Sequence, residues 1–222
     1  MIRTIFNETQ SSARCALFQL ERMRKLPSPQ PKQGFRPVLL VHGFMGNQYM
    51  MYPIARRLLL AGVPAVVIAE YSSWTCTLEQ IIDHLEQRVA SEPTEYAEWD
   101  VIGHSLGAIA LRAWFKTRET APPVRKFIAL GPPFQGTGWF RIVPEVLREV
   151  FEPDGPWVKR LATGPEPVAT HIIRARHDQN IRPSSSSSLP GAQQTILETI
   201  GHNGLLNHRT AIDAILDALV KL

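Results

Sequence analysis

Short, uninterrupted apolar runs alternate with longer segments of helical periodicity along most of this chain. The runs that predict strands are Val38–Val41, Ala65–Ala69, Val101–Ile102, Val124–Leu130, Thr170–Arg174 and Thr195–Ile200. The segments that predict helices are Tyr52–Ala61, Leu78–Val89, Leu106–Lys116, Val143–Phe151 and Thr210–Leu222. Strands that are apolar without alternation are buried on both faces, so the pattern predicts a three-layer α/β fold with a mostly parallel sheet and helices on both sides.

The composition is that of an ordinary globular domain, with 44% hydrophobic and 20% charged residues among 222. Two cysteines are too few for a disulfide framework or a cysteine-rich zinc site. The longest apolar stretch, Leu58–Ala69, is shorter than the roughly 20 residues that a membrane-spanning helix needs. The net charge is +4, but the basic residues are scattered and no nucleic-acid-binding signature accompanies them, so no nucleic-acid partner is expected.

The first 34 residues differ from the rest of the chain. Apolar positions recur at nearly helical spacing over residues 4–26, and the proline-rich stretch Pro27–Pro31 then acts as a linker. We therefore expect an amphipathic helical appendage over 1–34, followed by one domain over 35–222. Packing of this helix on the outside of the domain is favoured, with peripheral membrane contact as the alternative. Since no secretion signal is recognised, a cytoplasmic location is expected, and the oligomeric state stays open.

The interval 131–168 departs from the strand–helix rhythm. It holds five glycines, several prolines and one helical stretch, and connections of this length tend to be lids or binding loops. We expect a helical, lid-like insertion over the carboxyl edge of the sheet. Phe134, Trp139 and Phe140 are candidate substrate-binding residues that could line an acyl pocket, and packing of a lid on the core is the alternative.

The segment Asp100–Ala108 contains the pattern G-x-S-x-G between a predicted strand and a predicted helix. A serine at such a strained turn presents its hydroxyl above the sheet, and side chains at Gly103 and Gly107 would collide with neighbouring backbone. Ser105 is therefore the candidate nucleophile. The alternative is an ordinary strand-to-helix turn with a capping serine.

A serine nucleophile needs a base, and seven histidines compete for that role. His202 is favoured because it directly follows the last predicted strand within a glycine-flanked loop, and His208 is second. His104, within the turn itself, is expected to point away from the substrate side by strand alternation. Asp178 follows the penultimate strand, which places it at the same sheet edge as Ser105 and His202.

Asp154 and Glu166 are less constrained alternatives for the acid, since both lie in the irregular insertion. The segment His42–Gly46 follows the first predicted strand, as an oxyanion loop would. A tetrahedral oxyanion needs two preorganised backbone N–H groups, and the candidates are the amides of Phe44 and Leu106. His42 is expected to support this loop rather than to bind a metal.

Together with Gly131–Thr137, these motifs resemble the α/β-hydrolase superfamily, and within it the small bacterial lipases and esterases of the class 2 triacylglycerol-lipase type. The resemblance covers about residues 36–222 and includes the chain order serine, aspartate, histidine. It implies a carboxylic ester hydrolase that acts without metal or cofactor on a small-molecule or lipid ester. It further implies an acyl-enzyme on Ser105, with His202 as base and Asp178 as its orienting group.

Two other functions stay open. The same triad would make the protein an acyltransferase if an alcohol or amine, rather than water, accepts the acyl group. A non-catalytic hydrolase-fold module associated with a membrane is the third possibility, although a scaffold has no physical need for the full serine–histidine–aspartate set.

Overall fold

The chain folds around one six-stranded sheet in which every pairing is parallel. The computed structural model describes residues 2–20, 25–92 and 96–220. The strands are β1 (Val38–Val41), β2 (Val66–Ile68), β3 (Trp99–His104), β4 (Val124–Leu130), β5 (Thr170–Ala175) and β6 (Gln193–Leu197), in the order β2-β1-β3-β4-β5-β6. From β1 the chain adds β2 on one side, and from β3 it adds β4 to β6 on the other side, so the strand order reverses between β1 and β3. The carboxyl ends of these two strands therefore flank the crevice where ligands of open α/β sheets bind.

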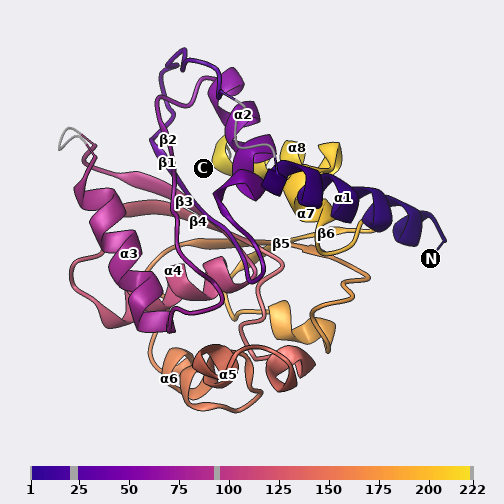
Figure 1. The fold of residues 1–222 in the computed structure, drawn as a ribbon. Helices are drawn as coiled ribbons and strands as arrows, with labels where there is room; N and C mark the ends of the chain where they lie inside the picture. Colours follow the sequence, from indigo (N-terminus) through magenta and orange to yellow (C-terminus); the bar gives the residue numbers. More distant parts are fainter. Residues whose placement is uncertain (1, 21–24, 93–95, 221–222) are drawn as a thin grey trace.

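The two faces of the sheet bury different sets of helices, and strand alternation sorts the side chains between them. Leu39 and Val41 of β1 pack with α3 (Leu78–Ala90) and α4 (Leu106–Thr117). Val38 and Leu40 pack instead with α2 (Tyr52–Ala61) and α8 (Arg209–Val220). Figure 1 shows these two helical layers on opposite sides of the sheet, which confirms the predicted three-layer architecture.

The predicted strands and longer helices agree with the observed ones to within a few residues. Thr77 caps α3 through a reciprocal contact with Gln80. The last strand differs most, because β6 ends at Leu197 and the chain then turns toward His202. Among the described residues, two α-helices were not predicted, α6 (Pro156–Ala162) and α7 (Gly204–Asn207). Both are too short to show a clear helical period.

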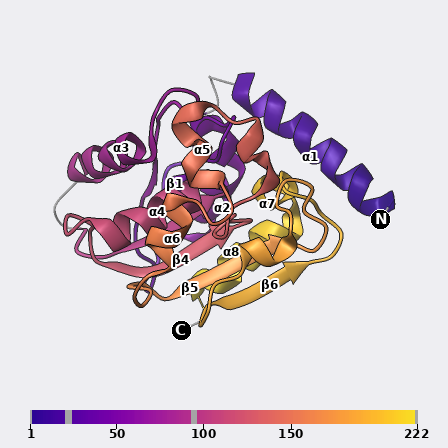
Figure 2. The ribbon, with the colours of Figure 1, turned by 90° about the horizontal axis from the view of Figure 1, so that it is seen from below.

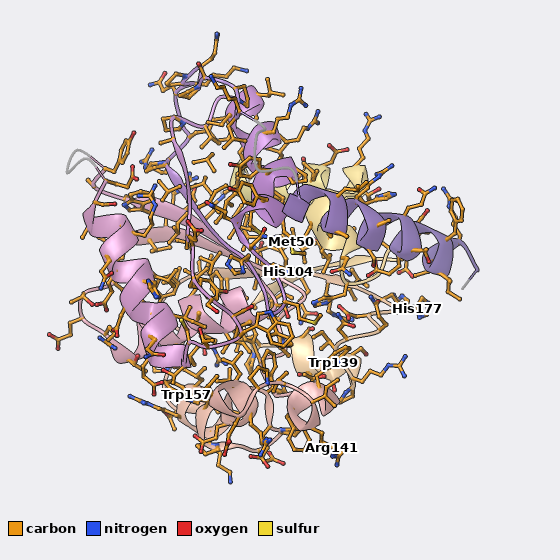
Figure 3. The ribbon with its side chains drawn as sticks, viewed as in Figure 1. Met50, His104, Trp139, Arg141, Trp157 and His177 are labelled. Carbon is orange, nitrogen blue, oxygen red and sulfur yellow. The ribbon has the colours of Figure 1, made fainter. Side chains whose placement is uncertain are left out.

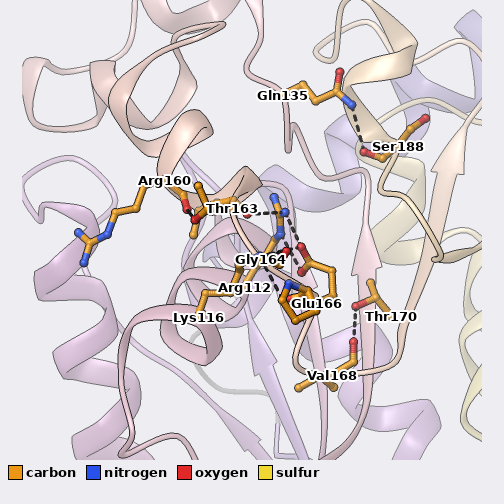
Figure 4. Close-up of polar contacts among 12 residues, drawn as sticks. Arg112, Lys116, Gln135, Arg160, Thr163, Gly164, Glu166, Val168, Thr170 and Ser188 are labelled. Atoms are coloured by element: carbon orange, nitrogen blue, oxygen red, sulfur yellow. Dashed lines mark hydrogen bonds and ion pairs between the residues drawn. The ribbon is translucent and has the colours of Figure 1, made fainter.

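The insertion 131–168 folds into the short helix η2 (Gly138–Arg141), α5 (Glu145–Phe151) and α6. It is fixed to α4 by an ion pair in which Arg112 donates to both oxygens of Glu166, at 3.0 Å from Nε and 2.6 Å from Nη2 (Figure 4). Lys116 also reaches this carboxylate, and Arg112 donates to the Leu161 carbonyl at 2.8 Å. Because the guanidinium is buried and makes these three hydrogen bonds, the base of the insertion is held to the sheet domain.

The amino-terminal helix α1 (Ile2–Leu20) lies against α7 at the carboxyl edge of the sheet, as both ribbon views show (Figures 1 and 2). The predicted helix extended to residue 26, but residues 21–24 lie outside the described part of the chain. Within the described ranges, none of the helices combines the length and the apolar character needed to cross a bilayer.

Candidate active site

Ser105 occupies a sharp turn between β3 and α4. Its backbone has φ 52° and ψ −115°, a conformation in the left-handed half of φ space that L side chains rarely adopt. A Cβ on Gly103 would lie 2.6 Å from the Ala108 backbone, and one on Gly107 would lie 2.5 Å from the His42 carbonyl oxygen. The two glycines therefore allow three backbone segments to meet, and the serine stands above their junction.

His202 and Asp178 form a direct contact at the same sheet edge. His202 lies after β6, Asp178 lies after β5, and 2.7 Å separates Nδ1 of the histidine from Oδ2 of the aspartate. The other carboxylate oxygen of Asp178 accepts from the amides of Asn180 at 2.8 Å and Ile181 at 3.0 Å. The acid is thus held by its own loop, and its contact to Nδ1 leaves Nε2 as the histidine nitrogen that could reach a substrate.

The charges around His202 stabilise its protonated form more than burial destabilises it. Burial lowers the pKa of this histidine, but the Asp178 carboxylate and, more weakly, Glu8 of α1 outweigh it, so the pKa is raised above its ordinary value. His202 is 3% exposed and Ser105 is 7% exposed, so both are largely screened from solvent. A positive charge that develops on His202 would therefore be stabilised where water contributes little.

The loop after β1 lies beside the serine. A Cβ on Gly43 would be 3.0 Å from the Ser105 Cβ, and the loop is closed by a hydrogen bond from the Gly46 amide to the Gly43 carbonyl. The Met45 amide donates a hydrogen bond to the Ser73 hydroxyl oxygen, at 3.1 Å. On the other side of Ser105, the first amides of α4 lack intrahelical acceptors, as in any helix. The loop that contains Phe44 and the start of α4 at Leu106 therefore both lie next to Ser105.

Two further buried histidines lie close to the triad residues. His42 contacts the Gly43 carbonyl through Nδ1 at 3.0 Å and stacks on Tyr71, with 4.1 Å between ring centroids. Burial lowers its pKa to about 4, so it is a neutral part of the loop.

His104 corrects the alternation argument, because its ring lies 4.6 Å from that of His202, and its side chain lines the cavity at Ser105. His104 is the last residue of β3 and keeps the strand alternation, so it faces the same side of the sheet as Ile102. The His202 loop and α7 pack on that side, which the sequence argument did not anticipate. Burial, followed by the proximity of His202, lowers the pKa of His104 well below its ordinary value. His104 is therefore a neutral neighbour of His202.

A cavity of about 250 Å³ opens at Ser105. Besides His104, Ser105, His202 and Asn203, its lining comes from four parts of the chain: Ser12, Cys15 and Ala16 of α1, Phe44, Met45 and Met50 after β1, Thr137, Trp139, Val143 and Phe151 of the insertion, and Asn180 and Ile181 beside Asp178. Figure 3 shows Met50 and His104 close together near the centre of the molecule, with Trp139 below them and Arg141 at the outer side of the insertion. The walls away from the triad are mainly apolar.

The three aromatic candidates of the insertion separate in the structure. Trp139 lines the cavity, whereas Phe134 packs against Phe127 and under the Arg112 guanidinium, 4.9 Å from ring centroid to Cζ. Phe140 packs on the core beside the Arg141 guanidinium. The α1 residues at the cavity were missed by sequence reasoning, because nothing local in residues 1–34 indicates which part of the domain they contact.

The less favoured sequence candidates lie away from Ser105. Glu166 is bound by Arg112 and Lys116, and His208 accepts from the Thr210 amide at the start of α8. Within the part of the chain that the structure describes, no three His, Cys, Asp or Glu side chains are grouped so as to hold a metal ion.

No curated protein sequence matches this chain. Among solved structures, it is similar to the Bacillus licheniformis lipase BlEst2 in its mature form, with a TM-score of 0.68 and 14% identity over 87% of this chain and 95% of that one. It is similar to the thioesterase domain from the curacin biosynthetic pathway, with a TM-score of 0.63 and 12% identity over 86% and 93%. The phospholipase PlaB from Legionella pneumophila gives a TM-score of 0.66 and 15% identity over 84% of this chain and 59% of that chain. These similarities confirm the α/β-hydrolase fold.

A sequence family extends over more than half of the chain. The model of the palmitoyl protein thioesterase family matches residues 37–175, which include the Phe44 loop and the Ser105 turn but end before Asp178 and His202. The match thus covers the part of the site around Ser105, whereas Asp178 and His202 lie beyond its end. This chain belongs to the palmitoyl protein thioesterase family.

Proposed function

We propose that this protein is a serine-dependent hydrolase of acyl esters, with Ser105 as nucleophile, His202 as general base and Asp178 as the group that orients His202. One observation carries the proposal. Ser105, on its strained turn, shares a largely apolar cavity with His202, which is bound through Nδ1 to a carboxylate fixed by two backbone amides.

In the first half-reaction, Nε2 of His202 takes the proton of the Ser105 hydroxyl as Oγ attacks the substrate carbonyl. The amides of Phe44 and Leu106 would hold the oxyanion, and loss of one such donor typically costs about 3 kcal/mol. When the tetrahedral intermediate collapses, His202 gives its proton to the leaving alcohol or thiol. The acyl group stays on Ser105.

In the second half-reaction, His202 takes a proton from water, whose oxygen attacks the acyl-enzyme. Collapse of this second intermediate returns the proton to Ser105 and releases the free acid. Asp178 keeps its contact with Nδ1 throughout, so the histidine stays in the tautomer that leaves Nε2 available. The raised pKa of His202 matches a base that must carry a charge in both transition states.

The apolar wall favours a substrate with an aliphatic acyl chain. Trp139, Val143 and Phe151 contribute this wall from the insertion, and Phe44 and Met50 contribute it from the loop after β1. Membership of a thioesterase family makes S-acyl as well as O-acyl esters worth testing, since the acyl-enzyme is the same from both. We propose an acyl ester or thioester of medium to long chain as the substrate.

The first experiment is intact-mass measurement after incubation with a small fluorophosphonate, followed by peptide mapping. We expect a single adduct on Ser105 and none on Ser105→Ala. Hydrolysis of matched O-acyl and S-acyl esters across a chain-length series then defines the substrate. Absence of an adduct on the folded wild-type chain would overturn the proposal, and transfer of the acyl group to an added alcohol in place of acid release would assign an acyltransferase.

A further inference from the structure

Helix α1 packs on the segment 199–207, called here the histidine loop because it contains His202, through polar side chains rather than through an apolar face. Its buried positions include Thr4, Ser11 and Cys15. The contacts to the loop are Asn7 to the Thr199 carbonyl at 2.7 Å, the Asn203 amide side chain to the Ser12 hydroxyl at 3.0 Å, and Asn207 to the Ser11 carbonyl at 3.0 Å. Each of these contacts requires a defined orientation, so α1 fixes the segment 199–207 in one position.

Glu8 is the centre of this interface. Its Oε1 accepts from the Asn203 amide at 2.8 Å, and its Oε2 accepts from the Gly204 amide at 3.1 Å. These two amides open α7, where no side chain of the loop itself caps the helix. Glu8 therefore supplies from α1 the acceptor that the helix start needs, immediately after His202.

Gln179 extends the contact to His202 itself. Its Nε2 donates to Glu8, and its Oε1 accepts from the backbone amide of His202 at 3.2 Å. A Cβ on Gly201 would lie 2.6 Å from the Glu8 carboxylate and 2.7 Å from Gln179, so the glycine leaves the space that both side chains occupy. The Glu8 carboxylate thus holds Asn203 and Gly204 directly, and it holds the backbone amide of His202 through the Gln179 side chain.

The charged and titratable groups around His202 come from four parts of the chain. Asp178 contacts Nδ1 from the connection between β5 and β6, Glu8 approaches from α1, and His104 lies beside the ring at the end of β3, with His42 behind it. Burial lowers the pKa of both His104 and His42, so they are neutral and leave two carboxylates next to the base. Removing either negative charge destabilises the imidazolium.

We infer that Glu8 is a positioning residue of the active site: it holds the histidine loop through Asn203, Gly204 and Gln179 and adds a second negative charge beside His202. This inference rests on the proposed function. It makes α1 part of the catalytic unit, although the helix precedes the matched family region and contributes no group that reacts.

Two substitutions separate charge from geometry. Glu8→Gln keeps one acceptor oxygen but removes the charge, so the acid limb of the kcat/KM profile should move to lower pH, because the pKa of His202 falls. Glu8→Ala removes the acceptors as well, and kcat should drop about 10- to 100-fold with KM little changed, as for a small displacement of the base. The exposed Glu119→Gln is the matched control and should leave both quantities at wild-type values.

The same fluorophosphonate reaction keeps the two claims apart. If wild-type Ser105 is labelled, but the Glu8 variants react at the wild-type rate and with the wild-type pH dependence, Glu8 has no positioning role. A lower thermal midpoint with unchanged pH limb and kcat would make it a structural contact only. If wild-type Ser105 is not labelled, the proposed function itself fails.

The outer face of α1 supports a second inference from a different observation. Ile5, Phe6 and Leu17 are each about three-fifths exposed, at 60%, 61% and 59%, and the exposed Ala13 and Ala16 lie on the same helical stripe. The amphipathic helix thus presents its apolar stripe outward and its polar side inward, the reverse of an ordinary surface helix. Exposed apolar patches of this kind mark interaction sites.

Charge and position favour a lipid surface as the occupant. Arg3 and Arg14 lie beside the stripe, and the one acidic residue of α1, Glu8, faces the protein. Two copies meeting at this face would bring like charges together, whereas anionic headgroups would meet opposite ones. The stripe also adjoins the cavity, since Ala16 and the half-exposed Met45 both line it.

We propose that α1 lies on an anionic lipid surface with Phe6 and Leu17 inserted. Co-sedimentation with phosphatidylcholine vesicles, with and without added phosphatidylglycerol, tests this proposal. Wild type should bind the anionic vesicles, and the double variant Phe6→Ser with Leu17→Ser should bind about 100-fold more weakly, given the apolar burial lost. Leu60→Ser on α2, equally exposed, is the control and should bind like wild type. Equal binding of wild type and double variant, or binding by neither, would overturn the proposal; a dimer lost only in the double variant would assign the face to a second copy.

Discussion

The cavity at Ser105 has two walls that are built in different ways. The strand-end wall, formed by the Phe44 loop and the Ser105 turn, is backbone packed on backbone, with a Cβ on Gly103 or Gly107 placed no more than 2.6 Å from the nearest main-chain atoms. The covering wall, formed by α1 and the insertion 131–168, consists of side-chain contacts such as Glu8 to Asn203 and Arg112 to Glu166. Close backbone approach depends on glycine and is therefore visible in sequence, whereas side-chain docking can use many residue types.

The largest effect is expected at the strand-end wall, where the chemistry is proposed to occur. Ser105→Ala should lower kcat about 10⁶-fold, because loss of the nucleophile leaves only binding and the oxyanion donors. The thermal midpoint should stay close to that of wild type, since the buried hydroxyl is replaced by a smaller group on the same backbone. Turnover of an activated ester, measured alongside thermal unfolding, checks both. Retained turnover in the folded variant would remove Ser105 from the mechanism.

Asp178→Asn tests the group that connects the two walls. We expect a loss of about 10⁴-fold in kcat, because an amide can hold the wrong tautomer of His202 and no longer stabilises the imidazolium. In wild type the base must be neutral, so its raised pKa moves the acid limb of kcat/KM to higher pH than an unperturbed histidine would give. In the variant burial dominates, the pKa of His202 falls and the residual activity should persist to lower pH. An acid limb at the wild-type position in Asp178→Asn would show that another group titrates there.

Much of the strand-end wall could be predicted from sequence because its requirements are local. The pattern from Gly103 to Gly107 specifies a strand, a tight turn and a helix, and the observed β3 and α4 meet at Ser105 as that pattern requires. Asp178 and His202 could be placed at the same edge because parallel strands end together. His104 shows the limit of this reasoning: it keeps the alternation of β3, but the sequence does not show that the His202 loop packs on the side that it faces.

Gly107→Ala should break the strand-end wall by sterics alone. The added Cβ would sit 2.5 Å from the His42 carbonyl oxygen, so β1 and α4 must separate, and we expect a loss of about 3 kcal/mol in the free energy of unfolding. Gly138→Ala in the covering wall is the matched control, since its Cβ would meet no atom within 4 Å. Denaturant unfolding of both variants checks the contrast. Equal stability would mean that backbone contact is not what distinguishes the two walls.

The covering wall could not be predicted in the same way. Glu8 contacts residues almost two hundred positions away in the sequence. The sequence of α1 alone is that of an ordinary amphipathic helix, whose polar side is expected to face solvent. The apolar spacing of residues 4–26 indicated a helix, but the structure turns the stripe outward. Likewise, three aromatic residues of the insertion were equivalent in sequence, and only the fold separates Trp139 from Phe134 and Phe140.

The difference between Trp139 and its neighbour Phe140 tests whether the covering wall selects the acyl chain, and its expected effect is the smallest. Trp139 and Phe140 are adjacent, aromatic and both half-buried, and both pack on the core, but of the two only Trp139 also lines the cavity. Trp139→Ala should lower kcat/KM about tenfold for long acyl chains and change it little for acetyl esters, because only a long chain reaches the lost surface. Phe140→Ala should lower the thermal midpoint and leave the chain-length profile of wild type. A chain-length series on both variants decides the point: the same profile in both would mean that the insertion covers the cavity without selecting the acyl chain.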